Sequence, residues 1–139
     1  MSEEKHSKLL SRSDIFGIAD DIQTERVEVP EWGGAVLVRG LTGAERDAFE
    51  ASVVGERKKD SKFNYQNFRS RLAVMSIVDE DGKRAFSQAD VQRLGERSAL
   101  PLQRIFNVAQ RLSGIDEGDV EEMTGNSSSG ETSAAFTSD

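Results

Sequence analysis

Apolar and polar residues alternate with a period of two between residues 24 and 41. The alternating valines lie on both sides of the Gly33-Gly34 pair: Val27, Val29, Val36 and Val38. Alternation on both sides of a glycine pair is typical of a β-hairpin, because successive side chains of a strand point to opposite faces. We therefore predict two antiparallel strands, over residues 24–30 and 35–41.

Beyond the hairpin, apolar residues recur every three or four positions, the period of an amphipathic helix. Thr42 and Glu45 fit a capping box that begins a helix over residues 44–54. Its predicted inward face consists of Ala48, Phe49, Ser52 and Val53. A second helix is predicted over residues 63–78. Its apolar stripe, opposite Arg69 and Arg71, consists of Tyr65, Phe68, Leu72, Met75 and Val78.

Shorter elements follow this second helix. The run Asp79-Glu80-Asp81-Gly82 predicts a turn after which residues 83–86 pair back as a short strand. Ser87 and Asp90, three positions apart, resemble a cap that opens a short helix through Val91 and Leu94.

The last predicted helix begins at Ser98 and ends at Gly114, which is expected to be its C-cap. Its apolar stripe consists of Leu102, Ile105, Phe106, Ala109 and Leu112. At the other end of the chain, Ser13-Asp14 is expected to cap a short helix over residues 15–19.

These elements predict an α+β fold, with an N-terminal hairpin packed on a small bundle of three to four helices. Residues 1–20 are expected to be a flexible or short-helical segment and residues 21–115 the folded domain. Residues 116–139 are acidic and rich in serine and glycine, and they contain too few apolar residues to form a core. We expect this segment to be a disordered tail.

Composition excludes several kinds of chemistry. The 139 residues include no cysteine, which removes disulfides, zinc thiolate sites and thiol nucleophiles. The single histidine, His6, lies in a polar N-terminus and is a poor candidate for a general base or a metal ligand. No apolar run reaches the roughly 20 residues that span a bilayer, and the N-terminus lacks a signal-peptide core. We expect a soluble, non-enzymatic protein without a cofactor or a metal.

The net charge of −7 is placed unevenly. Residues 116–139 hold seven acidic and no basic residues, so the remaining 18 acidic residues equal the 18 lysines and arginines of residues 1–115. A neutral domain with an acidic tail is expected to bind neither nucleic acid nor membranes, because phosphate affinity depends on clustered positive charge.

Two local motifs suggest ligands, but each has a simpler interpretation. The Asp79–Gly82 run begins like a calcium loop, yet Lys83 and Arg84 stand where further ligands and a glycine are required. We interpret it as a surface turn. The basic cluster at residues 57–59 with Lys62 is interleaved with acidic residues. This mixture favours a solvated loop over a phosphate site.

Two aromatic residues are candidates for binding a partner. Trp32 is the only tryptophan and lies at the predicted hairpin tip, where an exposed indole can anchor another protein. The competing interpretation, which tryptophan's usual burial favours, places Trp32 in the core. Phe136 stands alone in the polar tail and is a weaker candidate.

With these residues considered, the chain resembles the tail assembly chaperones of long-tailed bacteriophages, particularly those of actinobacterial hosts. The resemblance rests on ADDIQTERVEVPEWGGAVLVRGLTGAERDAFEASVV at residues 19–54 and RLAVMSIVDEDGKRAFSQADVQRLGERSALPLQRIFNVAQRLSGI at residues 71–115, followed by the acidic, serine-rich C-terminus. It thus covers most of the chain.

The resemblance implies a non-enzymatic protein that coats the tape measure protein, keeps it soluble and helps recruit major tail protein during tail polymerisation. It implies action in the cytoplasm of the bacterial host and absence from the mature virion. In many such phages a programmed ribosomal frameshift extends a minority of copies, and this chain resembles the unextended product. The extended form of the protein and further copies of the same chain are therefore additional expected partners.

One alternative from another class stays open. Four arginines near the last two helices, spaced four, seven and seven apart, form a stripe if they lie on one face: Arg93, Arg97, Arg104 and Arg111. In this alternative, the chain is a small cytoplasmic regulatory or adaptor protein, and the stripe is the surface that binds nucleic acid. The simpler interpretation is that the arginines form the solvent-exposed face of an amphipathic helix, which is the usual role of such a stripe.

Overall fold

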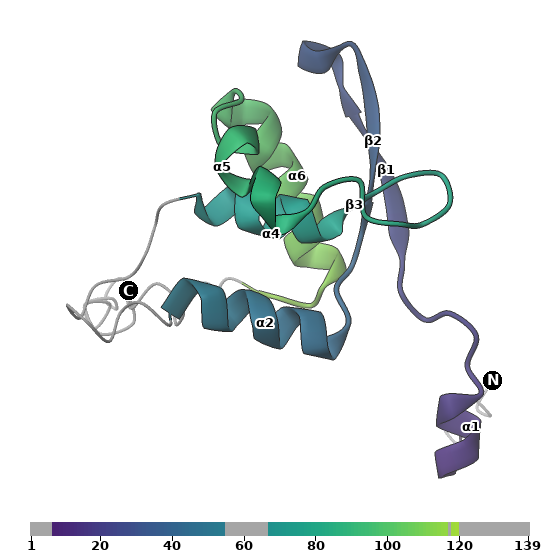
Figure 1. Ribbon diagram of the computed structural model, residues 1–139. Helices are drawn as coiled ribbons and strands as arrows, with labels where there is room; N and C mark the ends of the chain where they lie inside the picture. The colour runs from purple at the N-terminus through teal and green to yellow at the C-terminus, as the bar shows by residue number, and fades with distance from the viewer. Residues whose placement is uncertain (1–6, 55–66, 117, 120–139) are drawn as a thin grey trace, which may run out of the picture.

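The chain folds as a β-hairpin packed against a group of helices, which confirms the predicted α+β class (Figure 1). This computed structural model describes residues 7–54, 67–116 and 118–119. The predicted basic cluster at residues 57–62 and nearly all of the predicted tail, including Phe136, lie outside the described residues.

The hairpin consists of β1 (Thr24–Val29) and β2 (Gly34–Arg39), which are antiparallel with Val27 opposite Val36. The connection contains the short 3-10 helix η2 (Pro30–Trp32), and it closes at Gly33. Gly33 has a φ of 78°, a left-handed conformation that glycine adopts without steric cost. A third strand, β3 (Ile77–Val78), pairs antiparallel with β2, so β2 is the central strand.

Alternation decides which face of the hairpin is buried, as predicted. Val27, Val29 and Val38 are buried beneath the helices, and Val36 packs against the same core. The intervening residues of β1 are exposed on the other face: Thr24, Arg26 and Glu28. The period-two pattern therefore gives the hairpin one apolar face, and the helices cover that face.

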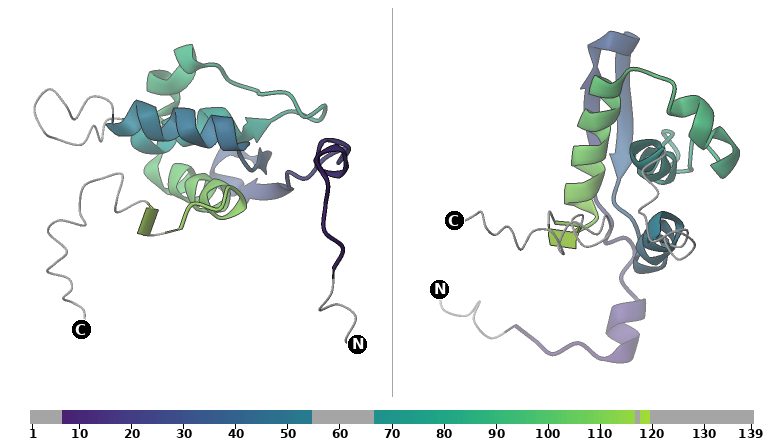
Figure 2. Two further views of the ribbon diagram at one scale, coloured as in Figure 1. Left: turned by 90° about the horizontal axis from the view of Figure 1, so that it is seen from below. Right: turned by 90° about the vertical axis from the view of Figure 1, so that its left-hand side faces the viewer.

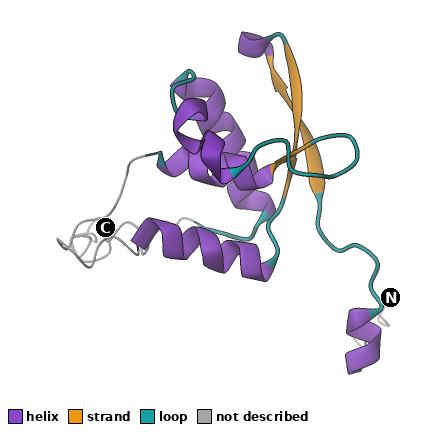
Figure 3. Ribbon diagram, viewed as in Figure 1, coloured by secondary structure: helices purple, strands orange, loops and turns teal. Residues whose placement is uncertain are grey.

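The helices are α1 (Arg12–Phe16), α2 (Gly43–Val54), α4 (Phe68–Ser76), η3 (Gln88–Asp90), α5 (Val91–Leu94) and α6 (Ala99–Leu112). Helix α6 packs on α4 and on both long strands, while α2 packs on α4. Figures 2 and 3 show α6 lying along the hairpin, with α1 standing apart beyond the beginning of β1. None of the described helices is long and apolar enough to cross a membrane.

Three phenylalanines join the three longer helices at the centre of the core. The Phe68 ring on α4 lies 5.7 Å from the Phe49 ring on α2 and 5.1 Å from the Phe106 ring on α6, measured between centroids. All three side chains are buried. Tilted rings at these separations add attraction to the gain from burial alone, so this triplet holds the helices together.

Two predicted cap positions are confirmed and one is wrong. Thr42 with Glu45 and Ser87 with Asp90 exchange the expected hydrogen bonds. The N-cap of α1, however, is Ser11 and not Ser13: its hydroxyl accepts from the Asp14 N–H, and the Asp14 carboxylate accepts from the Ser11 N–H. A capping box requires two residues that are three positions apart, as Ser11 and Asp14 are, whereas Ser13 is adjacent to Asp14.

The predicted helix over residues 63–78 is wrong at its C-terminal end. Helix α4 stops at Ser76, and Ile77 and Val78 pair with Val38 and Leu37 instead. Both residues are β-branched, which favours a strand wherever a partner strand is available. Residues 63–66 lie outside the described residues.

Three smaller predictions also need correction. Residues 83–86 form only a single bridge, between Arg84 and Val78, and not a strand. Ala48 is exposed, although Phe49 and Val53 of the same helix are buried as predicted. The C-cap of α6 is Ser113, and Gly114 follows it with a φ of 73°. Gly114 therefore supplies the left-handed residue that commonly follows a cap.

Candidate functional site

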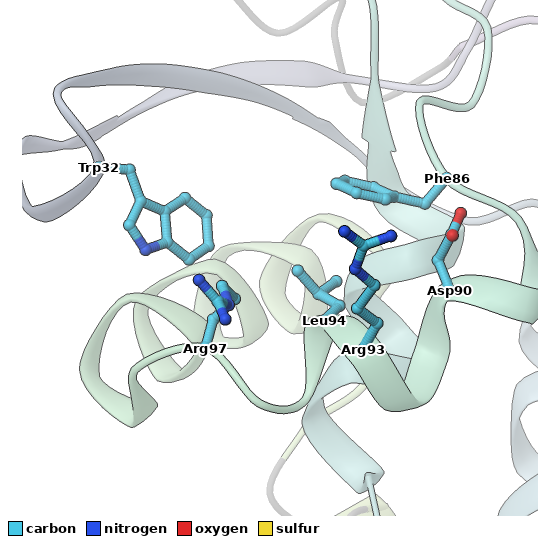
Figure 4. A pocket seen from close by; sticks show the side chains of 6 residues that line it. All are labelled: Trp32, Phe86, Asp90, Arg93, Leu94 and Arg97. Atoms are coloured by element: carbon cyan, nitrogen blue, oxygen red, sulfur yellow. The ribbon is translucent and has the colours of Figure 1, made fainter.

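A groove of about 550 Å³ lies between the tip of the hairpin and α5. Figure 4 shows the Trp32 ring on one wall, the Phe86 ring on the other, and Leu94 between them. The six lining residues are Trp32, Phe86, Asp90, Arg93, Leu94 and Arg97. Trp32 thus meets residues that lie 54 to 65 positions later in the chain, in one concavity with apolar walls.

Local structure places Trp32 over this groove. Pro30 begins the one-turn helix η2, and the Gly33 N–H donates to the Pro30 carbonyl at 3.0 Å, which turns the chain tightly just after Trp32. The tryptophan side chain keeps 37% of its surface exposed. A large aromatic side chain that is half covered by its own protein and half open to solvent suits a contact with a partner.

An ion pair holds the hairpin tip on α6. Arg104 donates to both oxygens of the Glu31 carboxylate, at 2.9 and 2.8 Å. These hydrogen bonds lower the pKa of Glu31 from 4.5 to about 2. Because Glu31 is the neighbour of Trp32, the pair fixes the position of the indole relative to the helices.

The net charge of the groove is positive, because two arginines and one carboxylate line it. The Asp90 carboxylate accepts the Ser87 N–H at 2.9 Å and so serves the cap of η3. Arg93 and Arg97 have no carboxylate within ion-pair distance among the described residues. Figure 4 shows their side chains pointing toward Phe86 and Trp32, respectively. Apolar walls with two unpaired cations favour a ligand that is both apolar and acidic.

The predicted arginine stripe is not one continuous basic face. Arg104 is bound to Glu31, and Arg111 donates to Glu25 of β1 at 2.8 and 3.0 Å. Only Arg93 and Arg97 remain unpaired, and they line the groove. Two arginines at the groove, instead of a continuous stripe of four, are therefore available for contacts with phosphates.

The Asp79–Gly82 segment is a turn, as interpreted. The Asp79 side chain accepts the N–H groups of Asp81 and Lys83, at 2.8 and 3.0 Å. The Asp79 carboxylate, which would be the first ligand of a calcium loop, thus accepts hydrogen bonds from the backbone of its own turn. Among the residues that the structure describes, no cluster of histidine or carboxylate side chains is suited to hold a metal.

A second apolar surface escaped the sequence analysis. It is the N-terminal arm, which we define as residues 7–20, and it includes the exposed side chains of Leu9, Leu10, Ile15, Phe16 and Ile18. The sequence predicts a flexible or short-helical segment here, outside the folded domain, but it does not single out these apolar residues as an exposed surface.

A small hairpin-and-helix domain with a groove and an exposed apolar arm has surfaces of the kind that contact other polypeptides. A comparison with known protein families identifies the family of this chain. The chain belongs to the phage tail assembly chaperone family, whose model matches residues 11–126. This finding confirms the resemblance drawn from the sequence.

The structure is also similar to a solved one, described as "Structure of bacteriophage HK97 tail assembly chaperone". The two share 21% sequence identity with a TM-score of 0.51, over 72% of this chain and 91% of that chain. At this identity the similarity shows a shared fold. No curated protein sequence matches the chain.

Proposed function

We propose that this tail assembly chaperone binds the tape measure protein, keeps it soluble, and helps recruit major tail protein while the tail polymerises. The observation that carries the proposal is the groove beneath Trp32, with its apolar walls and two unpaired arginines. Family membership supports the role in tail assembly. The groove supports a contact with an extended, amphipathic client.

The proposed contact is an amphipathic helix of the client lying in the groove. Its apolar face would pack on Trp32, Phe86 and Leu94, as in other helix-in-groove complexes. Acidic residues of the client would approach Arg93 and Arg97. A single contact of this size is weak, but many chaperones along one long client give strong overall binding through avidity.

The remaining parts of the proposal follow from the same role. The protein acts in the cytoplasm of the bacterial host, is absent from the mature virion, and catalyses no reaction. A frameshift-extended form of the chain would supply a second domain that contacts major tail protein. Trp32 is the proposed partner-binding residue on the domain, and Phe136 is a proposed contact in the tail.

Co-expression with the tape measure protein of the same phage tests this proposal. The tape measure protein should be found in the soluble fraction when the full chain is present and in the pellet when it is absent. A Trp32→Ser variant should lose most of this effect. Leu100→Ser is the matched control, because Leu100 is 64% exposed but does not line the groove.

An unchanged amount of soluble tape measure protein, with no complex on affinity purification, would contradict the proposal. Binding of the purified chain to DNA in a steeply salt-dependent manner would instead favour the adaptor alternative, because phosphate contacts release counterions.

A further inference from the structure

The groove beneath Trp32 is accessible to a ligand from solvent. Trp32, Arg93 and Arg97 are all exposed, and the two arginines have no carboxylate partner among the described residues. An exposed aromatic surface beside uncompensated positive charge favours an occupant that is apolar and acidic. The chain itself contains a segment with this chemistry.

That segment is the C-terminal segment, which we define as residues 120–139 and which lies outside the described residues. It carries four carboxylates and no lysine or arginine. It also contains Phe136, the only aromatic residue after Phe106, with Glu131 and Asp139 on either side of it in the sequence. A phenylalanine ring packs well on other aromatic rings, and carboxylates match the free arginines of the groove.

The start of the C-terminal segment is held at a defined place on the domain. Arg46 on α2 lies 3.1 Å from the Asp119 carboxylate and donates to the Gly114 carbonyl at 3.3 Å. Asp116 and Asp119 also accept each other's N–H groups, at 2.8 and 3.0 Å. The segment therefore begins beside α2, close to the C-terminal end of α6.

The groove lies near the other end of α6, because Arg97 precedes the first residue of this helix by two positions. The 14 residues of α6 span about 21 Å. Phe136 lies 17 residues beyond Asp119, and a chain of this length that is rich in glycine and serine has a root-mean-square span of about 21–25 Å. The effective concentration of a tethered group is highest when its span matches the distance to its site.

We propose that the C-terminal segment docks in the Trp32 groove of its own chain. Phe136 packs between Trp32 and Phe86, the two rings that Figure 4 shows on facing walls. The carboxylates before and after Phe136 approach the two groove arginines. Because the contact is made within one chain, the fraction of occupied grooves does not depend on protein concentration.

Docking needs only this chain, whereas its regulatory consequence rests on the proposed function. If a client helix binds the groove, the client and the C-terminal segment compete for it. A helix covers more of the groove than one phenylalanine does, so the client displaces the segment and releases Phe136. Until then the segment shields the exposed indole, and it lowers the apparent affinity for the client in proportion to the fraction of free grooves.

Paramagnetic broadening in NMR spectra tests the docking without any client. The chain has no cysteine, so Ser138→Cys accepts a single nitroxide label two positions after Phe136. In the full chain, this label should broaden the amide signals of Leu94 and Arg97. It should broaden the signal of Arg26 much less, because Arg26 lies on the face of β1 that the helices do not cover.

Two variants of the labelled chain provide the comparison, after circular dichroism has established that each is folded. Phe136→Ser should reduce the broadening at the groove to the level at Arg26. Met123→Ser is the matched control and should leave the broadening unchanged. Met123 lies four residues after Asp119, and four residues span at most about 14 Å, which is too short to reach the groove.

Three results would overturn the proposal. The first is equal broadening of the groove and the uncovered face of β1, and the second is broadening that is strongest at another surface, such as the N-terminal arm. The third is undiminished groove broadening in isotope-labelled chains without nitroxide that are mixed with unlabelled chains carrying it. That result would assign the docked segment to a second copy.

A charge exchange within one chain gives an independent test. Arg93→Glu with Arg97→Glu should remove the groove broadening, and Glu131→Lys with Asp139→Lys should do the same. A chain that carries all four substitutions should recover it, because an acidic groove then meets a basic segment. Unchanged broadening in either charge-reversed variant would contradict the proposal.

Client binding tests the competition separately. Glu131→Gln with Asp139→Asn keeps Phe136 and should bind a tape measure fragment about threefold more tightly than wild type, the gain expected when about two thirds of the grooves were occupied. Equal affinities would contradict the competition. A fragment that binds neither protein would contradict the proposed function, and the broadening experiment would still decide whether the segment docks.

Discussion

Arg104 on α6 donates two hydrogen bonds, of 2.9 and 2.8 Å, to the carboxylate of Glu31 at the tip of the hairpin. A second pair, Arg111 with Glu25, joins the same helix to the beginning of β1. Arg104 and Arg111 lie about two helical turns apart on α6, so the two pairs hold the hairpin at its tip and at the beginning of β1. The site beneath Trp32 therefore has one wall whose position depends on a surface ion pair.

Neutralising that ion pair should weaken client binding more than it weakens the fold. Exposed ion pairs contribute little to stability, so Glu31→Gln should leave the unfolding midpoint nearly unchanged. It frees the hairpin tip, however, and should lower affinity for a tape measure fragment by about threefold to tenfold. Calorimetric titration measures this loss, and Glu28→Gln, at an exposed position of β1, is the control.

The same pair predicts a defined response to acid. The pKa of Glu31 is 4.5 when unpaired and about 2 in the fold, chiefly because Arg104 donates hydrogen bonds to it. A lowered carboxyl pKa stabilises the fold fully above pH 4.5, and this contribution is lost as the pH falls from 4.5 toward 2.

The difference between wild type and Glu31→Gln isolates this effect from other carboxylates. Because the pair is exposed, the thermal unfolding midpoints of the two proteins should differ only slightly above pH 4.5, and this small difference should vanish by about pH 2. Emission of Trp32, the only tryptophan, follows the hairpin tip during the same titration. A difference that is independent of pH would show that Arg104 does not hold the Glu31 carboxylate.

Truncating the central phenylalanine should cost far more than any surface change. Phe68→Ala removes the ring that contacts both Phe49 and Phe106, and it should lower the free energy of unfolding by about 3–5 kcal/mol. Phe16→Ala, on the exposed arm, should change it by less than about 0.5 kcal/mol, because Phe16 is 73% exposed. Urea denaturation of both variants makes the comparison.

Gly40 should tolerate no side chain, because the backbone of Leu112 occupies the space that a Cβ would need. A Cβ at this position would lie 2.5 Å from the Leu112 carbonyl oxygen at the end of α6. Gly40→Ala should therefore destabilise the protein by about 1–3 kcal/mol, as overpacking usually does. Gly43→Ala is the control, because a Cβ there meets nothing within 4 Å and should change stability by less than about 1 kcal/mol.

Local sequence rules predicted most of the elements but not their ends. The hairpin, the Thr42–Glu45 box and the Ser87–Asp90 box each depend on residues close together in the chain, and all three are present. The switch from α4 to β3 depends on β2, which lies about forty residues earlier. Periodicity alone does not separate a short buried strand from the continuation of a buried helix.

The groove was only partly predictable for the same reason. Trp32 was a candidate by its residue type and its place at a turn, but its partners Phe86 and Leu94 come from distant segments. The sequence predicts Arg93 and Arg97 only as part of a basic stripe. Only the pairing of Arg104 and Arg111 with hairpin carboxylates shows which two arginines remain free.

The most direct test of the central claim uses Trp32 as a reporter. A tryptophan-free fragment of the tape measure protein is titrated into the full chain while the emission maximum is followed. Burial of the indole by the client predicts a saturable shift to shorter wavelength, which Arg93→Glu with Arg97→Glu weakens. Binding of the fragment with an unchanged Trp32 spectrum would place the client elsewhere and contradict the account.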